Sequence, residues 1–174
     1  MIATPQAAAA WWRELQPDPA RKRPGDRAAL ARLRRCGTVA EAMLEPSTIA
    51  LFRRCGASGP DDLPAIALTA AVLAHVREDA PEQPVARQLG PDQPDKPETA
   101  ILKPLRFRRV MEAATPDERL VALRRMVALA GGRLNLCDLA EALLIWNDRR
   151  RQRWVYHYWN AGQIAARAPE ETAA

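Results

Sequence analysis

The chain has 174 residues, of which 48% are hydrophobic and 27% charged, which is ordinary for a folded domain and excludes a disordered chain. No apolar run reaches the about 20 residues that a membrane-spanning helix needs. The net charge is +5, and an acidic segment over residues 61–100 separates two basic blocks, at residues 1–60 and 101–167. This distribution indicates an anionic partner.

The first half of the chain reads as a series of helices joined by short loops. Pro5 suits the first turn of a helix that begins at Thr4, and Asp26 and Ser47 are candidate N-caps of later helices. The segment opened by Asp61 is the most apolar of the chain, so we expect it to be the central core helix. Helices are predicted over residues 4–15, 26–36, 38–44, 47–55 and 61–78.

The second half begins with residues 81–97, an acidic segment with five prolines that we expect to be a mobile loop. Thr115 followed by Pro116 and two acids is a strong helix start, Asn135 and Asp148 are candidate caps, and a flexible tail is expected from about residue 163. Helices are predicted over residues 101–114, 115–131, 135–146 and 148–160. Strand-like alternation is absent, so residues 1–174 are predicted to form one all-α domain, a bundle of about eight helices.

No catalytic or metal-binding constellation is visible in the sequence. His75 lies in the apolar segment and reads as a core residue, while His157 reads as a packing or surface residue; neither has metal-ligand spacing. Cys36, Cys55 and Cys137 form no C-x-x-C pair, so free thiols in a reducing cytoplasm are expected. No signal peptide is visible at the N-terminus. We therefore predict a cytoplasmic protein that is not an enzyme, with no metal, no cofactor and no membrane contact.

Arginines gather in four clusters on the predicted helices. Lysine occupies only three of the 26 basic positions, and arginine suits bidentate phosphate contact, although a GC-rich genome would also favour its codons. Each cluster alone could be a solvated helix face with local ion pairs. Together, fixed guanidinium groups on rigid helices could bridge phosphates without reading bases. The clusters are Arg27, Arg32, Arg34 and Arg35; Lys103, Arg106, Arg108 and Arg109; Arg124 and Arg125; and Arg149, Arg150, Arg151 and Arg153.

The five tryptophans offer two readings. Stacking of bases on indole rings would suit single-stranded nucleic acid. Because each tryptophan occupies an apolar helical position, packing in the core or at a subunit interface is favoured. They are Trp11, Trp12, Trp146, Trp154 and Trp159.

Five segments occur in an order and spacing that resemble a known family. They are WW-x-x-L, D-R-x-x-L-A-R-L-R-R, LKPLRFRRVM, LVALRRMV and LIWNDRRRQRW-x-Y-x-Y, and they span roughly residues 11–159. In this order they resemble CasB, the small subunit of the type I-E Cascade complex of CRISPR systems. The resemblance implies an all-helical, non-catalytic subunit, present in two copies beside other Cascade subunits. It also implies that the subunit helps to hold the guide RNA–target DNA hybrid and the displaced strand, independently of sequence.

The resemblance also selects the nucleic-acid-binding residues from the four clusters. The matching motifs carry Arg34, Arg35, Arg106, Arg109, Arg124, Arg125, Arg149, Arg150 and Arg153, and helix geometry adds Lys103. An alternative hypothesis is a structural adaptor whose arginines meet acidic protein surfaces. A stand-alone transcription regulator is a third, but few Asn or Gln residues stand among the arginines to read bases.

Overall fold

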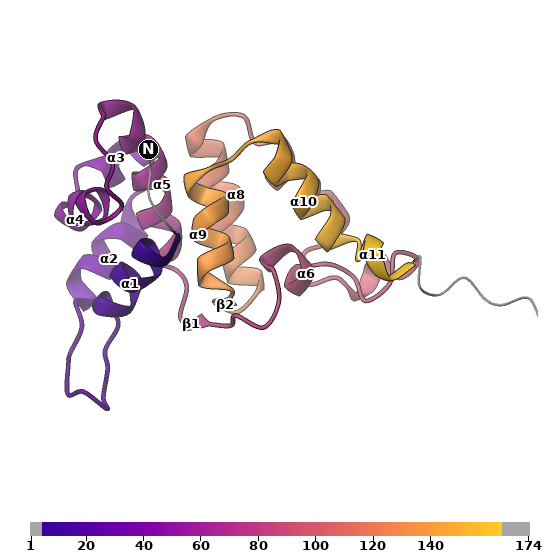
Figure 1. The fold of residues 1–174 in the computed structure, drawn as a ribbon, viewed down its shortest axis with the longest axis horizontal. Coiled ribbons are helices and arrows are strands. Elements are labelled where there is room, and N and C mark those ends of the chain that lie inside the picture. The colour runs from indigo at the N-terminus through magenta and orange to yellow at the C-terminus, as the bar shows by residue number, and fades with distance from the viewer. Residues whose placement is uncertain (1–4, 165–174) are drawn as a thin grey trace, which may run out of the picture.

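The structure, a computed structural model, describes residues 5–164 as an all-α arrangement, which confirms the predicted fold class (Figure 1). In Figure 1, α1–α5 form one side of the molecule, α8 and α9 stand in the middle, and α10 and α6 lie on the other side. The helices are α1 (Pro5–Leu15), α2 (Arg27–Arg35), α3 (Val39–Met43), α4 (Pro46–Arg54), α5 (Leu63–Leu73), α6 (Val85–Leu89), α7 (Pro104–Glu112), α8 (Pro116–Leu129), α9 (Leu136–Leu144), α10 (Asp148–Tyr158) and α11 (Ala161–Ile164). Short 3-10 helices precede α5 and α7 at Pro60–Asp62 and Pro97–Thr99.

Side-chain caps begin several helices where the sequence predicted them. The Asp26 carboxylate accepts the backbone N–H of Ala29 at 2.8 Å, and the Asn135 side chain accepts that of Asp138 at 3.0 Å. At α8 the N-cap Thr115 and Glu118 form a capping box, in which each side chain accepts the backbone N–H of the other residue. Such caps satisfy N–H groups that have no partner inside the helix.

Two predicted caps are displaced. Ser47 lies inside α4, where it is buried, and the helix begins at Pro46 because proline needs no N–H partner in a first turn. The cap of α10 is Asn147, which accepts the backbone N–H of Arg150 at 2.9 Å, so Asp148 is the first helical residue. The carboxylate of Asp148 still lies near the positive end of the helix dipole.

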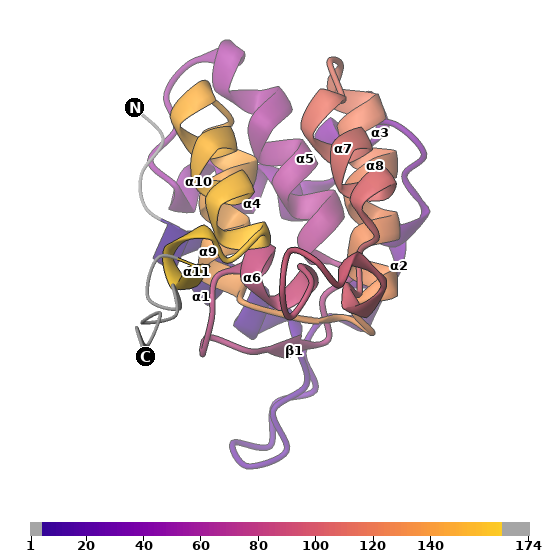
Figure 2. The same ribbon diagram turned by 90° about the vertical axis from the view of Figure 1, so that its right-hand side faces the viewer.

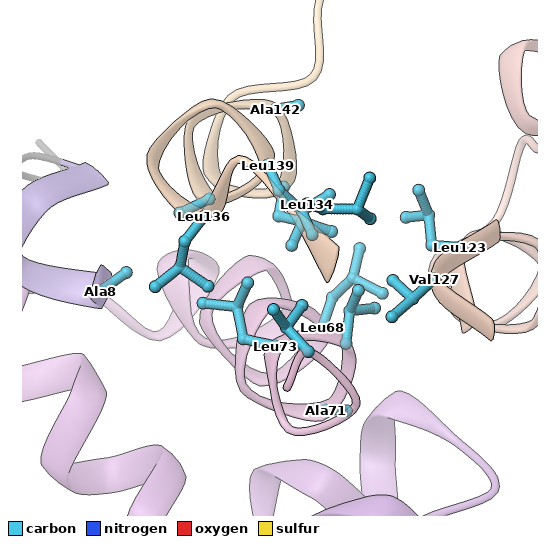
Figure 3. Packing of buried hydrophobic residues seen from close by; sticks show 14 of the residues in the cluster. Ala8, Leu68, Ala71, Leu73, Leu123, Val127, Leu134, Leu136, Leu139 and Ala142 are labelled. Carbon is cyan, nitrogen blue, oxygen red and sulfur yellow. The ribbon is translucent and has the colours of Figure 1, made fainter. Parts of the chain in front are cut away.

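Helix α5 is the centre of the core, as its composition predicted. Every residue from Ile66 to Leu73 is buried: α3, α4, α8 and α9 pack against the helix, and α1 packs on α9. A helix that is apolar on all sides can be stable only when neighbours cover all of them. Figure 3 shows the side chains that fill the space between these helices, among them Ala8, Leu68, Leu73, Leu123, Val127, Leu136 and Leu139.

A two-stranded parallel sheet interrupts the helical pattern. Strand β1 (Glu78–Asp79) pairs with β2 (Arg133–Leu134), which ties the end of the α5 segment to the start of α9. The core helix is therefore shorter than the predicted segment 61–78. A strand of two residues is too short to show an alternation of apolar and polar residues, so the sequence did not predict these strands.

The proline-rich segment 81–97 is not wholly a loop, because it contains α6. Val85, Ala86 and Leu89 are at most 1% exposed, and α6 packs against α10. The Arg87 guanidinium donates to four backbone carbonyls, those of His157 and Tyr158 in α10 and those of Gly90 and Pro91. Arg87 therefore satisfies carbonyl groups at the C-terminal ends of both helices.

Gly90 allows the ends of α6 and α10 to approach closely. A Cβ atom at this position would lie 2.0 Å from the carbonyl oxygen of Tyr158. The prediction of a loop was wrong here because α6 is only one to two turns long and is stabilised by contacts with α10, about 70 residues along the chain.

The tryptophans pack as predicted. Trp11, Trp12 and Trp154 are buried, and Trp146 and Trp159 are half-buried against the core. The indole N–H of Trp11 donates to the Ser47 carbonyl and that of Trp12 to the Val76 carbonyl. Among residues 5–164, no helix is long and apolar enough to cross a bilayer, and the tail predicted from about residue 163 lies mostly outside the described residues.

Candidate nucleic-acid interface

Helices α7 and α8 line a groove of about 1050 Å³. Its apolar lining includes Leu102, Val121 and Leu129, and the last two are 43% and 41% exposed. Three of the predicted arginines also line it: Arg106 and Arg109 from α7, and Arg125 from α8.

Helix spacing explains why these arginines face the groove. Phe107 and Val110 turn toward the core, so the positions that precede them by one residue, Arg106 and Arg109, share the flank beside the buried face. Arg108 is not among the residues that line the groove, and it pairs with Glu112 one turn further on.

The groove is lined by three arginines and three acids, and each acid has a partner other than the groove arginines. Asp117 accepts the backbone N–H of Val39 at 2.7 Å, and Glu118 belongs to the capping box of α8. Glu112 pairs with Arg108 at 3.3 Å. Within residues 5–164, the three groove arginines make neither an ion pair nor a side-chain hydrogen bond, so their charge is available to an outside anion. They are Arg106, Arg109 and Arg125.

Arg34 and Arg124, two other predicted site residues, bind helix ends instead. The Arg34 Nε donates to the Ala74 carbonyl at 2.6 Å, at the C-terminus of α5, and the Arg124 Nη2 donates to the Leu33 carbonyl at 3.1 Å, near the end of α2. These contacts join α2, α5 and α8. Burial, together with the positive charges of Arg124 and Arg34, lowers the pKa of His75 to about 4.

Arg150 and Lys103 also have partners within the fold. The Arg150 side chain is only 11% exposed and forms an ion pair with Glu141 of α9. The Lys103 ammonium donates to the backbone carbonyl of Glu98. Their charges are therefore partly neutralised by neighbouring oxygens.

Arg149 and Arg153 lie on the surface of α10, and Arg35 on that of α2. All three are exposed and make no ion pair with another residue between 5 and 164. Arg149 and Arg153 are four residues apart, so they share one face of α10, whereas Trp154 turns into the core.

Contacts at its C-terminal end lock α10 against α7. The Tyr158 ring stacks on Phe107 with 3.9 Å between ring centroids, and its hydroxyl donates to the Leu102 carbonyl at 2.6 Å. Burial raises the pKa of Tyr158 to about 12. In Figure 2, α10 and α7 lie on the side of the molecule that faces the viewer, α10 to the left and α7 to the right.

Arg119 is not among the residues predicted from the sequence, and Arg151 is in a predicted cluster but not among the predicted site residues. Both guanidinium groups lie over the ring of Trp146, with their Cζ atoms 5.6 and 5.9 Å from the ring centroid. Arg119 follows two acids in a helix start signal, and nothing in that local pattern distinguishes it. Its contact with Trp146 depends on how α8 packs against the end of α9.

Both the sequence and the fold are similar to those of known proteins. A family model described as CRISPR-associated protein Cse2 matches residues 29–159, well over half of the chain and the part that holds every predicted site residue. The fold is similar to that of a chain in the crystal structure of E. coli Cascade bound to a PAM-containing dsDNA target, with a TM-score of 0.60 and 19% sequence identity. The likeness covers 92% of this chain and 99% of that chain. A comparison with curated proteins found no match.

Proposed function

This chain belongs to the Cse2 family of CRISPR-associated proteins, as its resemblance to CasB predicted, and we propose that it is the non-catalytic small subunit of a type I-E Cascade complex. In this role it binds the guide RNA–target DNA hybrid and the displaced strand through sequence-independent contacts between arginines and phosphates. Its other partners are the remaining Cascade subunits and a second copy of itself.

The observation that carries the proposal is the set of three groove arginines without carboxylate partners, Arg106, Arg109 and Arg125. The three arginines project from two packed helices, so their backbone positions keep a fixed spacing, and each guanidinium can contact a phosphate through two N–H groups. Contacts of this kind hold the backbone and carry no sequence information. In an RNA-guided complex base pairing reads the sequence, so a few phosphate contacts can tip a nearly balanced strand exchange.

The remaining predicted residues divide by their contacts. Arg149, Arg153 and Arg35 are exposed without ion pairs, so we assign them to further phosphate contacts. Arg34 and Arg124 bind helix ends and Arg150 pairs with Glu141, so their main role is to position the helices. Lys103, bound to the Glu98 carbonyl, keeps its positive charge near the groove.

Two neighbouring arginines on α7 provide a matched test. Arg109→Glu and Arg108→Glu change the net charge equally, but only Arg109 lines the groove. In a mobility-shift titration of the full chain at low salt, we expect Arg109→Glu to weaken DNA and RNA binding at least about tenfold more than Arg108→Glu, since a charged hydrogen bond contributes about 1.5–3 kcal/mol. Equal losses in the two variants would contradict the groove as the contact.

A second candidate function, a structural adaptor, is favoured by the apolar lining of the same groove. Val121 and Leu129 are exposed there beside the arginines, which would suit an acidic amphipathic segment of another protein. The adaptor predicts no retardation of DNA or RNA by the isolated protein at micromolar concentration and low salt. It also predicts that Val121→Asn, which adds no charge, weakens assembly with partner subunits, whereas phosphate binding in the groove should tolerate this substitution.

A further inference from the structure

The segment that joins α1 to α2, residues 16–25, projects from the body of the molecule. Figure 1 and Figure 2 both show it extending below α1 and α2, away from the other helices. Residues 19–24 are all exposed, and no residue of the segment belongs to the hydrophobic core. The segment also lies outside residues 29–159, which the family model matches. We call it the basic hairpin.

Backbone hydrogen bonds hold the basic hairpin in a defined conformation. Asp18 and Arg23 face each other across it, and the backbone N–H of each donates to the carbonyl of the other, at 2.8 and 2.9 Å. At the tip, the Lys22 N–H donates to the Pro19 carbonyl at 3.2 Å, and the Asp18 carboxylate accepts the N–H of Arg21 at 3.1 Å. The segment also contains three prolines, each of which has a restricted φ.

Gly25 fixes the base of the basic hairpin. Its φ is +67°, in the left-handed region, and a Cβ atom there would lie 2.5 Å from the Leu15 carbonyl oxygen. The next residue, Asp26, donates its N–H to the same carbonyl at 2.9 Å and caps α2. The base is therefore tied to the ends of both helices, which set the direction in which the hairpin projects.

Three consecutive cations, Arg21, Lys22 and Arg23, occupy the exposed end of the basic hairpin. The side chains of Arg21 and Arg23 are 75% and 48% exposed, and both lie near the Asp18 carboxylate, at 3.8 and 3.6 Å. Lys22 forms no ion pair with another residue between 5 and 164. One carboxylate therefore accompanies three cations, which leaves two net positive charges at the end of the hairpin.

The rest of the fold does little to neutralise this charge. Exposed ion pairs as long as those of Asp18 contribute little free energy, because water screens them. The Glu14 carboxylate, whose pKa is lowered in small part by the charge of Arg23, is engaged by Arg54 at 2.8 Å. The cations of the hairpin are thus available to an anionic partner.

The composition of the exposed end fits phosphate better than a protein surface. Besides the three cations, its exposed residues are Pro19, Ala20 and Pro24, so it offers no aromatic or long aliphatic side chain. The buried centre of a protein–protein interface is rich in aromatic residues and poor in lysine. Contacts with a nucleic acid backbone, in contrast, are made mainly by arginine and lysine.

We propose that the basic hairpin is a second nucleic-acid contact of this protein, which binds backbone phosphates through Arg21, Lys22 and Arg23. Because hydrogen bonds already order the hairpin, little backbone freedom is lost when it binds. No residue of the hairpin lines the α7–α8 groove, so this contact does not rest on the one in the proposed function. DNA and RNA backbones present the same phosphate chemistry to it.

The test measures binding of the full chain to labelled duplex DNA, single-stranded DNA and single-stranded RNA of equal length, by fluorescence anisotropy at several NaCl concentrations. In the hairpin variant, Arg21, Lys22 and Arg23 are replaced by glutamine. Two net charges at about 0.9 each should lower the slope of log K against log salt for duplex DNA by about 1.8. Over a roughly fourfold rise in salt, wild-type affinity should therefore fall about 12-fold further than that of the variant.

The matched control carries the same change in net charge at arginines that already have carboxylate partners. Arg13, Arg32 and Arg133, which are paired with Asp79, Glu45 and Glu78, are replaced by glutamine. Equal slopes in the hairpin variant and this control would overturn the proposal, and so would failure of the wild-type chain to bind any of the three probes. The probe whose affinity falls most in the hairpin variant identifies the source of the phosphates.

A single substitution keeps the test decisive if the hairpin variant does not fold. Lys22→Asn removes one unpaired charge, and asparagine suits the positive φ of 53° at this position. It should lower the slope by about 0.9, and an unchanged slope would overturn the proposal.

The groove variant, in which Arg106, Arg109 and Arg125 are glutamine, separates this proposal from the proposed function. Loss of affinity in the hairpin variant alone supports the hairpin contact and contradicts the groove contact. Loss in the groove variant alone overturns the hairpin contact and leaves the proposed function intact. Losses in both variants that multiply when the substitutions are combined support two separate contacts.

Discussion

The salt dependence of DNA binding should report directly on the three groove arginines. Replacement of Arg106, Arg109 and Arg125 by glutamine removes three guanidinium groups that bind no other residue between 5 and 164. Because they make no internal contact, we expect the melting temperature of the variant to change little.

The expected magnitude follows from counterion release. Each phosphate contact with duplex DNA contributes about 0.9 to the slope of log K against log salt, so three contacts contribute about 2.7. Over a roughly fourfold rise in salt, wild-type affinity should therefore fall about 40-fold further than that of the variant. The reduction of about one unit per arginine should be the same for unrelated DNA sequences.

Fluorescence anisotropy with a labelled duplex at several NaCl concentrations measures the slope. A matched control replaces Arg32, Arg54 and Arg133, which are paired with Glu45, Glu14 and Glu78, and changes the net charge by the same amount. If the groove variant and this control show the same slope, net charge alone governs binding, and the three groove arginines are not the phosphate contacts.

Three further predictions concern the fold that holds these sites. Arg87→Met removes the donors to four carbonyls and should lower the free energy of unfolding by about 2–3 kcal/mol, measured by denaturant titration. Gly90→Ala should destabilise the protein, because its Cβ would lie 2.0 Å from the Tyr158 carbonyl oxygen, whereas Gly59→Ala meets no atom within 4 Å; equal melting temperatures would contradict this. The pKa of His75 is lowered to about 4 in the folded state, from about 6.5 in the unfolded chain. The neutral imidazole therefore contributes fully to the free energy of unfolding above about pH 6.5, and this contribution is lost as the pH falls toward 4. His75→Gln should therefore flatten the acid side of the stability profile.

The adaptor hypothesis and the phosphate hypothesis place different demands on the same groove. An acidic partner segment would need both the exposed apolar side chains, such as Val121, and the arginines. A nucleic acid backbone needs only the arginines and should respond steeply to salt. The salt slope of the groove variant therefore separates the two functions as well as testing the contacts.

Much of the fold could be predicted from local sequence, because helix signals act over a few residues. Asp26, Thr115 and Asn135 cap their helices as expected, since a capping side chain reaches only N–H groups two or three positions ahead. The burial of α5 followed from its composition, because an apolar surface on every side must be covered. The basic clusters and their family resemblance were equally visible in the sequence.

Only the tertiary structure decided which arginines face outward without a partner. Arg124 and Arg125 are adjacent in the sequence, yet Arg124 donates to the Leu33 carbonyl, 91 residues away, while Arg125 lines the groove. Likewise, α6 exists because α10 packs on it, and Arg119 meets Trp146 because α8 lies beside the end of α9. Charge and helical propensity are local properties, but the partner that neutralises a charge is fixed by long-range packing, which no short sequence pattern encodes.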